Sequence, residues 1–175
     1  MLKLIALVII ALIALALIYA ATRPDTFRVE RSIAIKAVPE KIFPLINDFR
    51  EWDAWTPYNK DPAIKKTYGG AASGKGATYA WEGNKDVGKG DIAITGGVAP
   101  KQIELELHMI EPFEGRNRVV FTLNPQGDAT RVTWAMDGAQ AYMVKVIGLF
   151  MSMDKMVGKD FEVGLGQLKT LAEKN

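Results

Sequence analysis

The sequence predicts an α+β fold in which a curved antiparallel sheet is covered by a long C-terminal helix, with an apolar helix at the N-terminus. Three observations predict it. Residues 4–21 are uninterruptedly apolar. Between residues 27 and 136, stretches of alternating apolar and polar residues are separated by turns rich in Gly, Pro and Asn, which is the pattern of antiparallel strands. From Tyr142 to Glu173, apolar residues recur at helical spacing.

The composition predicts one globular domain behind the apolar run. The chain has 175 residues, of which 49% are hydrophobic, and its formal net charge is only +2. A surface that binds nucleic acid needs a larger excess of positive charge, so we expect no nucleic-acid partner. The absence of cysteine excludes disulfides, iron–sulfur ligation and thiolate zinc sites. Because His108 is the only histidine, a zinc hydrolase or a Ser-His-Asp enzyme is disfavoured, and we expect no metal and no cofactor.

Residues 4–21 are long enough to cross a bilayer as a helix. At about 1.5 Å per residue the run spans roughly 27 Å, close to the thickness of a hydrocarbon core. A cleaved signal peptide is the alternative, since Lys3 precedes the run and alanines end it. We favour a retained anchor because Tyr19 suits a membrane interface and Arg23-Pro24-Asp25 resembles a juxtamembrane exit.

The predicted organisation is a single-pass anchor at residues 1–22, a linker at 23–26 and one domain at 27–175. Lys3 and the N-terminal amine favour a domain outside the cytoplasm, whereas the arginines on the other flank oppose that orientation.

The elements of the domain follow from its periodicity. A first strand covers residues 27–36, Pro39 opens a short helix, and Asn47-Asp48 can cap a second one that runs through Trp52. A mobile connection from Gly69 to Gly76 follows. The further strands are predicted at 64–68, 77–81, 91–95, 101–109, 117–123 and 130–136. On the strand at 101–109, His108 falls on the polar face among glutamates.

The segment from Tyr142 to Glu173 is read as one helix with a Met-rich apolar face. Its glycines, Gly158 and Gly164, suggest a deformable and partly hollow inner surface. Lys145 falls on the polar side, whereas Asp154 falls near the centre of the apolar stripe. A buried carboxylate is usually paired, and Arg31 is the charged residue on the apolar face of the first strand. We therefore favour a structural Arg31–Asp154 pair, or local bonding and partial exposure of Asp154, over a catalytic acid, with a polar anchor for a ligand as the other possibility.

Two glycine-rich stretches resemble nucleotide-binding motifs but do not match them. Residues 69–75 read G-x-x-x-x-G-K, but Gly76 follows the lysine where a phosphate loop needs Ser or Thr. A strand, not a helix, is expected behind it, so a flexible rim loop is the better interpretation. Gly74-x-Gly76 does not extend to a dinucleotide fingerprint, because Tyr79 occupies the third glycine position.

In its order of elements the chain resembles the SRPBCC superfamily, the START and birch-pollen-allergen-like helix-grip fold. Within it, the chain is similar to bacterial membrane-anchored members of the polyketide cyclase/dehydrase and lipid transport group. The residues that carry the resemblance are Val29-Glu30-Arg31-Ser32-Ile33, Pro39-Glu40-Lys41-Ile42-Phe43, Ile46-Asn47-Asp48-Phe49, Trp52, Trp55, Ser73-Gly74-Lys75-Gly76-Ala77, Tyr79-Ala80-Trp81-Glu82-Gly83-Asn84, Thr130-Arg131-Val132-Thr133-Trp134, Gly148-Leu149-Phe150-Met151, Asp154-Lys155-Met156-Val157-Gly158 and Phe161 to Leu168. The resemblance implies an internal cavity, between sheet and long helix, that accepts lipids, polyketides or other apolar molecules.

The leading hypothesis is a membrane-anchored domain that binds an apolar small molecule or lipid in this cavity without turnover. The residues expected to line or border the cavity are Tyr79, Trp81, Trp134, Met136, Met151, Asp154 and Phe161. The rival is a cyclase or dehydratase in which Asp154 or Tyr79 moves protons. A third interpretation, a quinone or lipid chaperone, predicts a pocket mouth facing the bilayer and an exposed apolar rim near residues 52–58. The ligand and the oligomeric state stay open.

Overall fold

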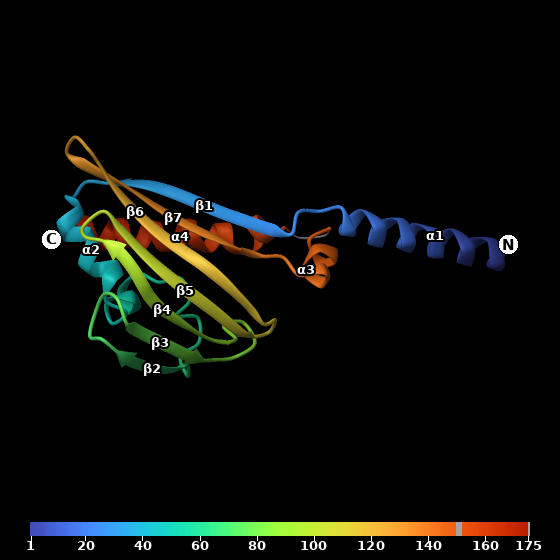
Figure 1. The fold of residues 1–175 in the computed structure, drawn as a ribbon, viewed down its shortest axis with the longest axis horizontal. Helices are drawn as coiled ribbons and strands as arrows, with labels where there is room; N and C mark the ends of the chain where they lie inside the picture. The colour runs from blue at the N-terminus through green and yellow to red at the C-terminus, as the bar shows by residue number, and fades with distance from the viewer. Residues whose placement is uncertain (150–151, 175) are drawn as a thin grey trace.

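The computed structural model describes residues 1–149 and 152–174, and it confirms the α+β helix-grip architecture (Figure 1). One antiparallel sheet of seven strands, in the order β1-β7-β6-β5-β4-β3-β2, curves around the helix α4. The elements in chain order are α1 (Leu2–Ala21), β1 (Thr26–Ile35), α2 (Pro39–Asn47), η1 (Glu51–Ala54), β2 (Lys65–Gly70), β3 (Ala77–Glu82), β4 (Lys89–Val98), β5 (Gln102–Glu111), β6 (Gly115–Gln126), β7 (Ala129–Ala139), α3 (Tyr142–Ile147) and α4 (Met153–Glu173).

Alternation along the strands separates an apolar concave face from a charged convex face. On β5, Ile103 and Leu105 are buried while Glu104 and Glu106 pair with Arg118 and Arg116 across the strand boundary. His108 lies on this convex face, as predicted, and its Nδ1 is 3.0 Å from an Asp91 carboxylate oxygen.

The two short helices after β1 close one end of the sheet. Pro39 opens α2, and the buried Ile42 and Ile46 face the core. The indole N–H groups of Trp52 and Trp55 donate to carbonyl oxygens of α2, those of Ile46 at 2.8 Å and Leu45 at 2.9 Å. These bonds satisfy two buried donors and hold η1 against α2.

The single helix expected from Tyr142 to Glu173 is wrong in one respect, because the structure divides this segment into α3 and α4. Gly148 ends α3, and its N–H donates a hydrogen bond to the Val144 carbonyl at 2.8 Å. Ser152 caps α4 by accepting a hydrogen bond from the N–H of Lys155. The apolar pattern continues through the interruption, which is why periodicity alone does not reveal it.

The interruption changes the surroundings of two charged residues. Asp154 does not lie in the buried stripe: it occupies the first turn of α4 and its side chain is 55% exposed. Lys145, expected on the polar side, is buried on α3, where its ammonium group pairs with the Asp25 carboxylate. A buried ammonium group requires such a partner.

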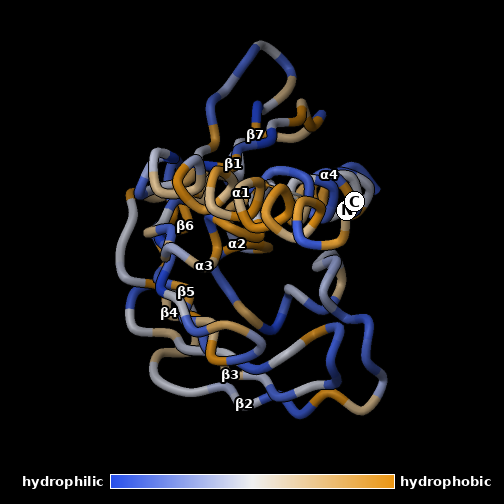
Figure 2. The backbone as a smooth tube through the Cα atoms, turned by 90° about the vertical axis from the view of Figure 1, so that its right-hand side faces the viewer, coloured by the Kyte–Doolittle hydropathy of each residue, from blue (hydrophilic) through white to orange (hydrophobic). Residues whose placement is uncertain are grey.

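The helix α1 lies beside α3 because of the sheet register. Thr26 at the start of β1 pairs with Ala139 at the end of β7, so the segments that precede β1 and follow β7 leave the sheet together. Figure 1 shows α1 extending away from the domain at this end. Figure 2, viewed along α1, shows that its residues are mostly hydrophobic. Within the described residues, α1 is the one helix long and apolar enough to cross a membrane.

Candidate functional site: an apolar cavity between the sheet and α4

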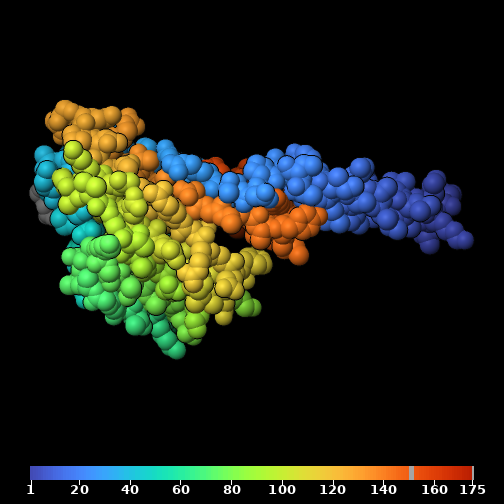
Figure 3. Space-filling model, viewed as in Figure 1, coloured from blue at the N-terminus to red at the C-terminus, as the bar shows by residue number. Residues whose placement is uncertain are grey.

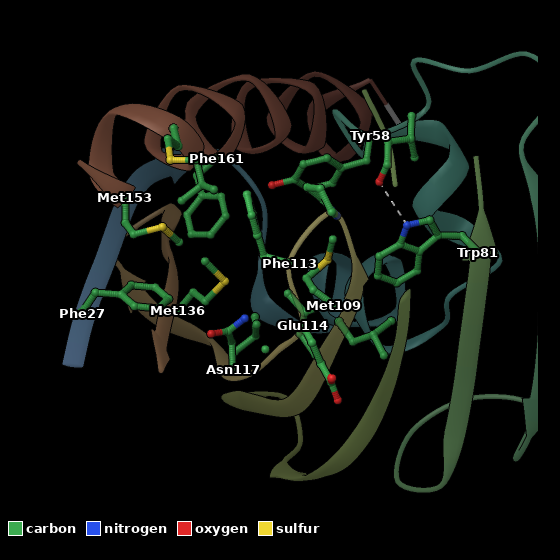
Figure 4. Close-up of a pocket in the computed structure, with 18 of the residues that line it drawn as sticks. Phe27, Tyr58, Trp81, Met109, Phe113, Glu114, Asn117, Met136, Met153 and Phe161 are labelled. Carbon is green, nitrogen blue, oxygen red and sulfur yellow. Dashed lines mark hydrogen bonds between the residues drawn. The ribbon is translucent and has the colours of Figure 1, made fainter. Parts of the chain in front are cut away.

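The concave face of the sheet is filled at one end and hollow at the other. At the end near α2, side chains from the sheet pack against Leu165, Leu168 and Ala172 of α4 in a solid core. Towards α1, a cavity of about 350 Å³ lies between the sheet and the first half of α4 (Figure 4). The division runs across single strands: on β5, Leu105 belongs to the core, whereas Leu107 and Met109 line the cavity.

The cavity wall is predominantly apolar and rich in flexible side chains. Met153, Met156, Val157 and Phe161 come from α4. The sheet contributes Phe27, Tyr79, Trp81, Ile92, Leu107, Met109, Val119, Trp134 and Met136. Methionine adapts its shape and contacts aromatic groups favourably, so this wall can follow apolar ligands of different outline.

A stacked aromatic pair marks the boundary between cavity and core. The rings of Trp134 and Phe161 lie 4.1 Å apart at an interplanar angle of 9°. Gly164 lies next to this pair, and a Cβ there would be 2.9 Å from the Trp134 ring and 3.0 Å from Pro57. The partly hollow inner surface predicted for this helix is present along its first half, but Gly158 and Gly164 do not create it: Trp134 and Pro57 occupy the space at Gly164, and the Arg31 guanidinium occupies the space at Gly158.

Polar side chains interrupt the apolar wall at Asp53, Thr56, Tyr58, Asn59, Glu114 and Asn117. Tyr58, between η1 and β2, points its hydroxyl into the cavity, and Asn117 of β6 lies on the opposite side (Figure 4). Among the described residues, the indole N–H of Trp134, which also lines the cavity, is a buried donor without a hydrogen-bond partner. The Trp81 indole, in contrast, is satisfied, because its N–H donates to the Val87 carbonyl at 3.3 Å.

The phenols of the cavity are protonated at neutral pH. Burial, and then the nearby Asp160 carboxylate, raise the pKa of Tyr58. Burial likewise raises the pKa of Tyr79 to about 12. The hydroxyl of Tyr58 is therefore a neutral group that can donate or accept a hydrogen bond within the apolar wall.

Most of the predicted site residues come together in this cavity. Tyr79, Trp81, Trp134, Met136 and Phe161 all contribute to its wall. Met151 lies outside the described residues. Asp154 is not part of the wall and faces Arg31 instead, whose Nη1 donates to a carboxylate oxygen at 2.8 Å. The favoured Arg31–Asp154 pair is thus present, although Asp154 is exposed and not buried.

Sequence reasoning missed Tyr58 and Asn117 as residues of the wall. Asn117 had a detectable signal, because it alternates in step with Val119 and Phe121 and so occupies an apolar-face position of its strand. Tyr58 had none, since it lies in an irregular segment whose path depends on tertiary packing. The contributions of α3, Val144 and Ile147, were hidden by the expectation of one continuous helix.

The cavity opens at the end of the sheet beside α1, and residues of the segment 52–59 line another part of its wall. Trp52 and Trp55 are buried, and the described structure has no exposed large apolar side chain at residues 52–58, so the apolar rim considered there is absent. Phe113 in the turn between β5 and β6 borders the cavity on one side, and α3 borders it on the other. Figure 3 shows a recess between α3 and this end of the β5–β6 hairpin, beneath the start of the domain.

Among residues 1–149 and 152–174 the structure shows no cluster of three or more His, Cys, Asp or Glu side chains suited to a metal ion. The carboxylates nearest to the cavity, Asp53 and Glu114, belong to its border and come from separate segments.

Comparisons with known proteins agree with this architecture. Residues 26–173 match a family model described as polyketide cyclase/dehydrase and lipid transport. The solution structure of the Aha1 dimer from Colwellia psychrerythraea is 20% identical, covers 84% of this chain and 96% of that chain, and has a TM-score of 0.58. The crystal structure of Ara h 8.0201 is 12% identical, covers 86% and 99%, and has a TM-score of 0.60. At these identities the likeness shows a shared fold. No curated protein matches the sequence.

Proposed function

Because the chain belongs to the polyketide cyclase/dehydrase and lipid transport family, we propose that it binds an apolar small molecule or lipid in the cavity, without turnover, while α1 tethers it to a membrane. The proposed organisation is an anchor at residues 1–22, a linker at 23–26 and a binding domain at 27–175. The proposed contact residues are Tyr79, Trp81, Trp134, Met136 and Phe161, joined by Tyr58 and Asn117.

One observation carries the proposal: the same apolar face that forms a solid core at one end of the sheet encloses a cavity at the other. Protein interiors are normally packed to the density of organic crystals, and an unfilled apolar volume reduces stability. A volume of about 350 Å³ is within the range of small-molecule sites. An apolar ligand would restore the contacts that the wall lacks.

The polar groups of the wall favour a ligand that is not a pure hydrocarbon. A phenol or amide in an apolar wall loses free energy unless a partner satisfies it. The Tyr58 hydroxyl and the Asn117 amide would be satisfied by a carbonyl or hydroxyl group on an otherwise apolar molecule. Ketones, quinones, esters and sterol-like alcohols share this chemistry.

The groups considered for proton transfer do not support the enzymatic alternative. Hydrogen bonds from Arg31 hold the pKa of Asp154 below its ordinary value, and this carboxylate lies outside the cavity. Tyr79, with its pKa raised to about 12, carries its proton at neutral pH and does not act as a base there.

The test compares the small molecules carried by two forms of the domain, residues 23–175 and the same segment with Leu107→Trp. A tryptophan at position 107 would fill the cavity, whereas the core residue Leu105 on the same strand stays intact. Mass spectrometry of organic extracts should find a near-stoichiometric apolar molecule with the unaltered domain and none with the variant. The proposal would be contradicted if the unaltered domain carried no such molecule and an added dansylated fatty acid did not quench the fluorescence of its cavity tryptophans.

A further inference from the structure

We infer that α1 and α3 hold the mouth of the cavity against the bilayer that contains α1, so that a ligand passes directly between cavity and lipid. This inference rests on the proposed function, because it concerns the route by which the ligand enters. The occupant of the surface around the mouth is the bilayer itself. The surface consists of Phe113, Tyr142, Met143 and Met156.

The anchor and the mouth lie at the same end of the domain for a topological reason. β1 and β7 are antiparallel neighbours, and the pairing of Thr26 with Ala139 places α1 and α3 side by side. β6 pairs with β7 through Asn117 and Gly138, which brings the β5–β6 turn to this end as well. The turn and α3 form the two borders of the recess in Figure 3.

Specific contacts join α1 to α3. The Tyr142 hydroxyl donates a hydrogen bond to the Leu17 carbonyl at 3.0 Å. Ala20 is fully buried, and the buried Lys145 pairs with Asp25 just beyond α1. The end of α1 is therefore packed into the domain, so α3 cannot move away from the membrane without breaking these contacts.

The contact with Leu17 also fixes the depth of α3. Leu17 belongs to the apolar run at residues 4–21, about one helical turn before its end. If α1 spans the bilayer, the Tyr142 hydroxyl lies at the boundary between hydrocarbon and headgroups. Tyr19 is at the same level, with the Arg23 guanidinium 5.9 Å from its ring centre. Tyrosine is the type of residue enriched at this depth.

Exposed apolar side chains are concentrated around the mouth. Phe113 is 57% exposed and Met143 is 63% exposed, although both are large apolar residues. Among the described residues outside α1, the exposed large apolar side chains at this end are Ile110, Phe113, Tyr142, Met143 and Met156, and those elsewhere are Val38, Val98 and Val163. A cluster of this kind beside an anchor helix fits a lipid surface, because contact with the bilayer removes these apolar side chains from water.

The chain has no cysteine, so single cysteines can report the depth of chosen sites. The full-length protein is placed in vesicles of phosphatidylcholine and phosphatidylglycerol, with an environment-sensitive fluorophore at F113C, M143C or V98C. Val98 is the matched control, because it is 59% exposed and is the last residue of β4, at the opposite end of the sheet. Lipids brominated near the headgroup should quench the probes at 113 and 143 several-fold more strongly than the probe at 98. Equal quenching at all three positions would overturn the inference.

A second measurement separates this inference from the proposed function. The variant M143E in the full-length protein, at an exposed position that does not line the cavity, should take up a pyrene-labelled fatty acid from vesicles at least tenfold more slowly, with an unchanged amount bound at equilibrium. The control V98E should match the unaltered protein. Unchanged uptake rates in M143E would overturn the membrane contact while leaving ligand binding intact. Loss of equilibrium binding in the unaltered protein would instead contradict the proposed function.

Discussion

Arg31 of β1 donates two hydrogen bonds to Asp154 of α4, from Nη1 at 2.8 Å and from Nη2 at 3.0 Å, one to each carboxylate oxygen. Its Nε donates to Glu162 on the same helix at 2.7 Å. The guanidinium fits between these carboxylates because Gly158 has no side chain: a Cβ there would be 2.2 Å from Nη2. The bidentate pair ties the start of α4 to the edge strand β1 at the cavity end.

The Arg31–Asp154 pair makes stability depend on pH. Arg31 lowers the pKa of Asp154 from 3.8, so the pair stabilises the fold above the unfolded pKa, and this contribution is lost as the pH falls through the folded value. We expect Asp154→Asn to unfold at lower denaturant than the unaltered domain at pH 7, and the difference to shrink below a pH of about 4. Urea unfolding at both pH values measures it. Asp128→Asn, in the exposed β6–β7 turn, is the control, and an equal loss at both pH values would contradict the role of the pair.

Two leucines on one strand should respond oppositely to enlargement. Leu105→Trp places extra volume in the packed core and should destabilise the domain by about 1–3 kcal/mol. Leu107→Trp extends into the cavity, so it should leave the melting temperature unchanged or raise it while abolishing binding of a dansylated fatty acid. Thermal unfolding and tryptophan-to-dansyl energy transfer measure the two effects. Similar destabilisation at both positions would mean that the cavity does not persist in solution.

The Tyr58 hydroxyl should discriminate between ligands with and without an oxygen. Tyr58→Phe should weaken binding of a long-chain ketone by about 1–2 kcal/mol and leave the alkane of equal length unaffected. Tyr68→Phe is the matched control, because Tyr68 stacks on Tyr79 but does not line the cavity. Displacement of a bound fluorescent probe gives both affinities. Equal weakening of ketone and alkane would assign Tyr58 a packing role only.

The protonation of Tyr58 adds a pH prediction. Because burial raises its pKa, the phenol keeps its proton throughout the neutral range, and the affinity for the ketone should be constant from about pH 6 to pH 9. A titration by probe displacement in this range measures it. A loss of affinity between pH 7 and pH 9 would show that the phenol ionises and does not act as a neutral partner.

Two glycines of α4 should respond differently to a methyl group. A Cβ at Gly166 meets no atom within 4 Å, so Gly166→Ala should stabilise the domain by about 0.5–1 kcal/mol through the reduced entropy of the unfolded chain. A Cβ at Gly164 would lie 2.9 Å from the Trp134 ring, and Gly164→Ala should therefore be destabilising by about 1–3 kcal/mol. Urea unfolding compares them. A stabilised Gly164→Ala variant would show that α4 does not pack closely on the sheet.

Local signals in the sequence predicted much of the fold. The alternation of apolar and polar residues located β1 and β5 to within a few residues. It could do so because each strand has one buried face, and because the backbone geometry of a strand places successive side chains on opposite faces. The apolar run of α1 is equally local. The aromatic residues of the cavity wall, such as Trp81 and Trp134, could be named because they share the apolar face of their strands.

The sequence by itself therefore determined the order of the elements, their inward faces and the family to which the chain belongs. Only the tertiary structure decided which part of the inward face is core and which is cavity. Leu105 and Leu107 are the same residue on the same face, and they differ because the elements that pack over the sheet fill the space at one end of it and not at the other. The division of the C-terminal segment into α3 and α4, and with it the exposed position of Asp154, also depends on packing, because the apolar period is the same on both sides of the interruption.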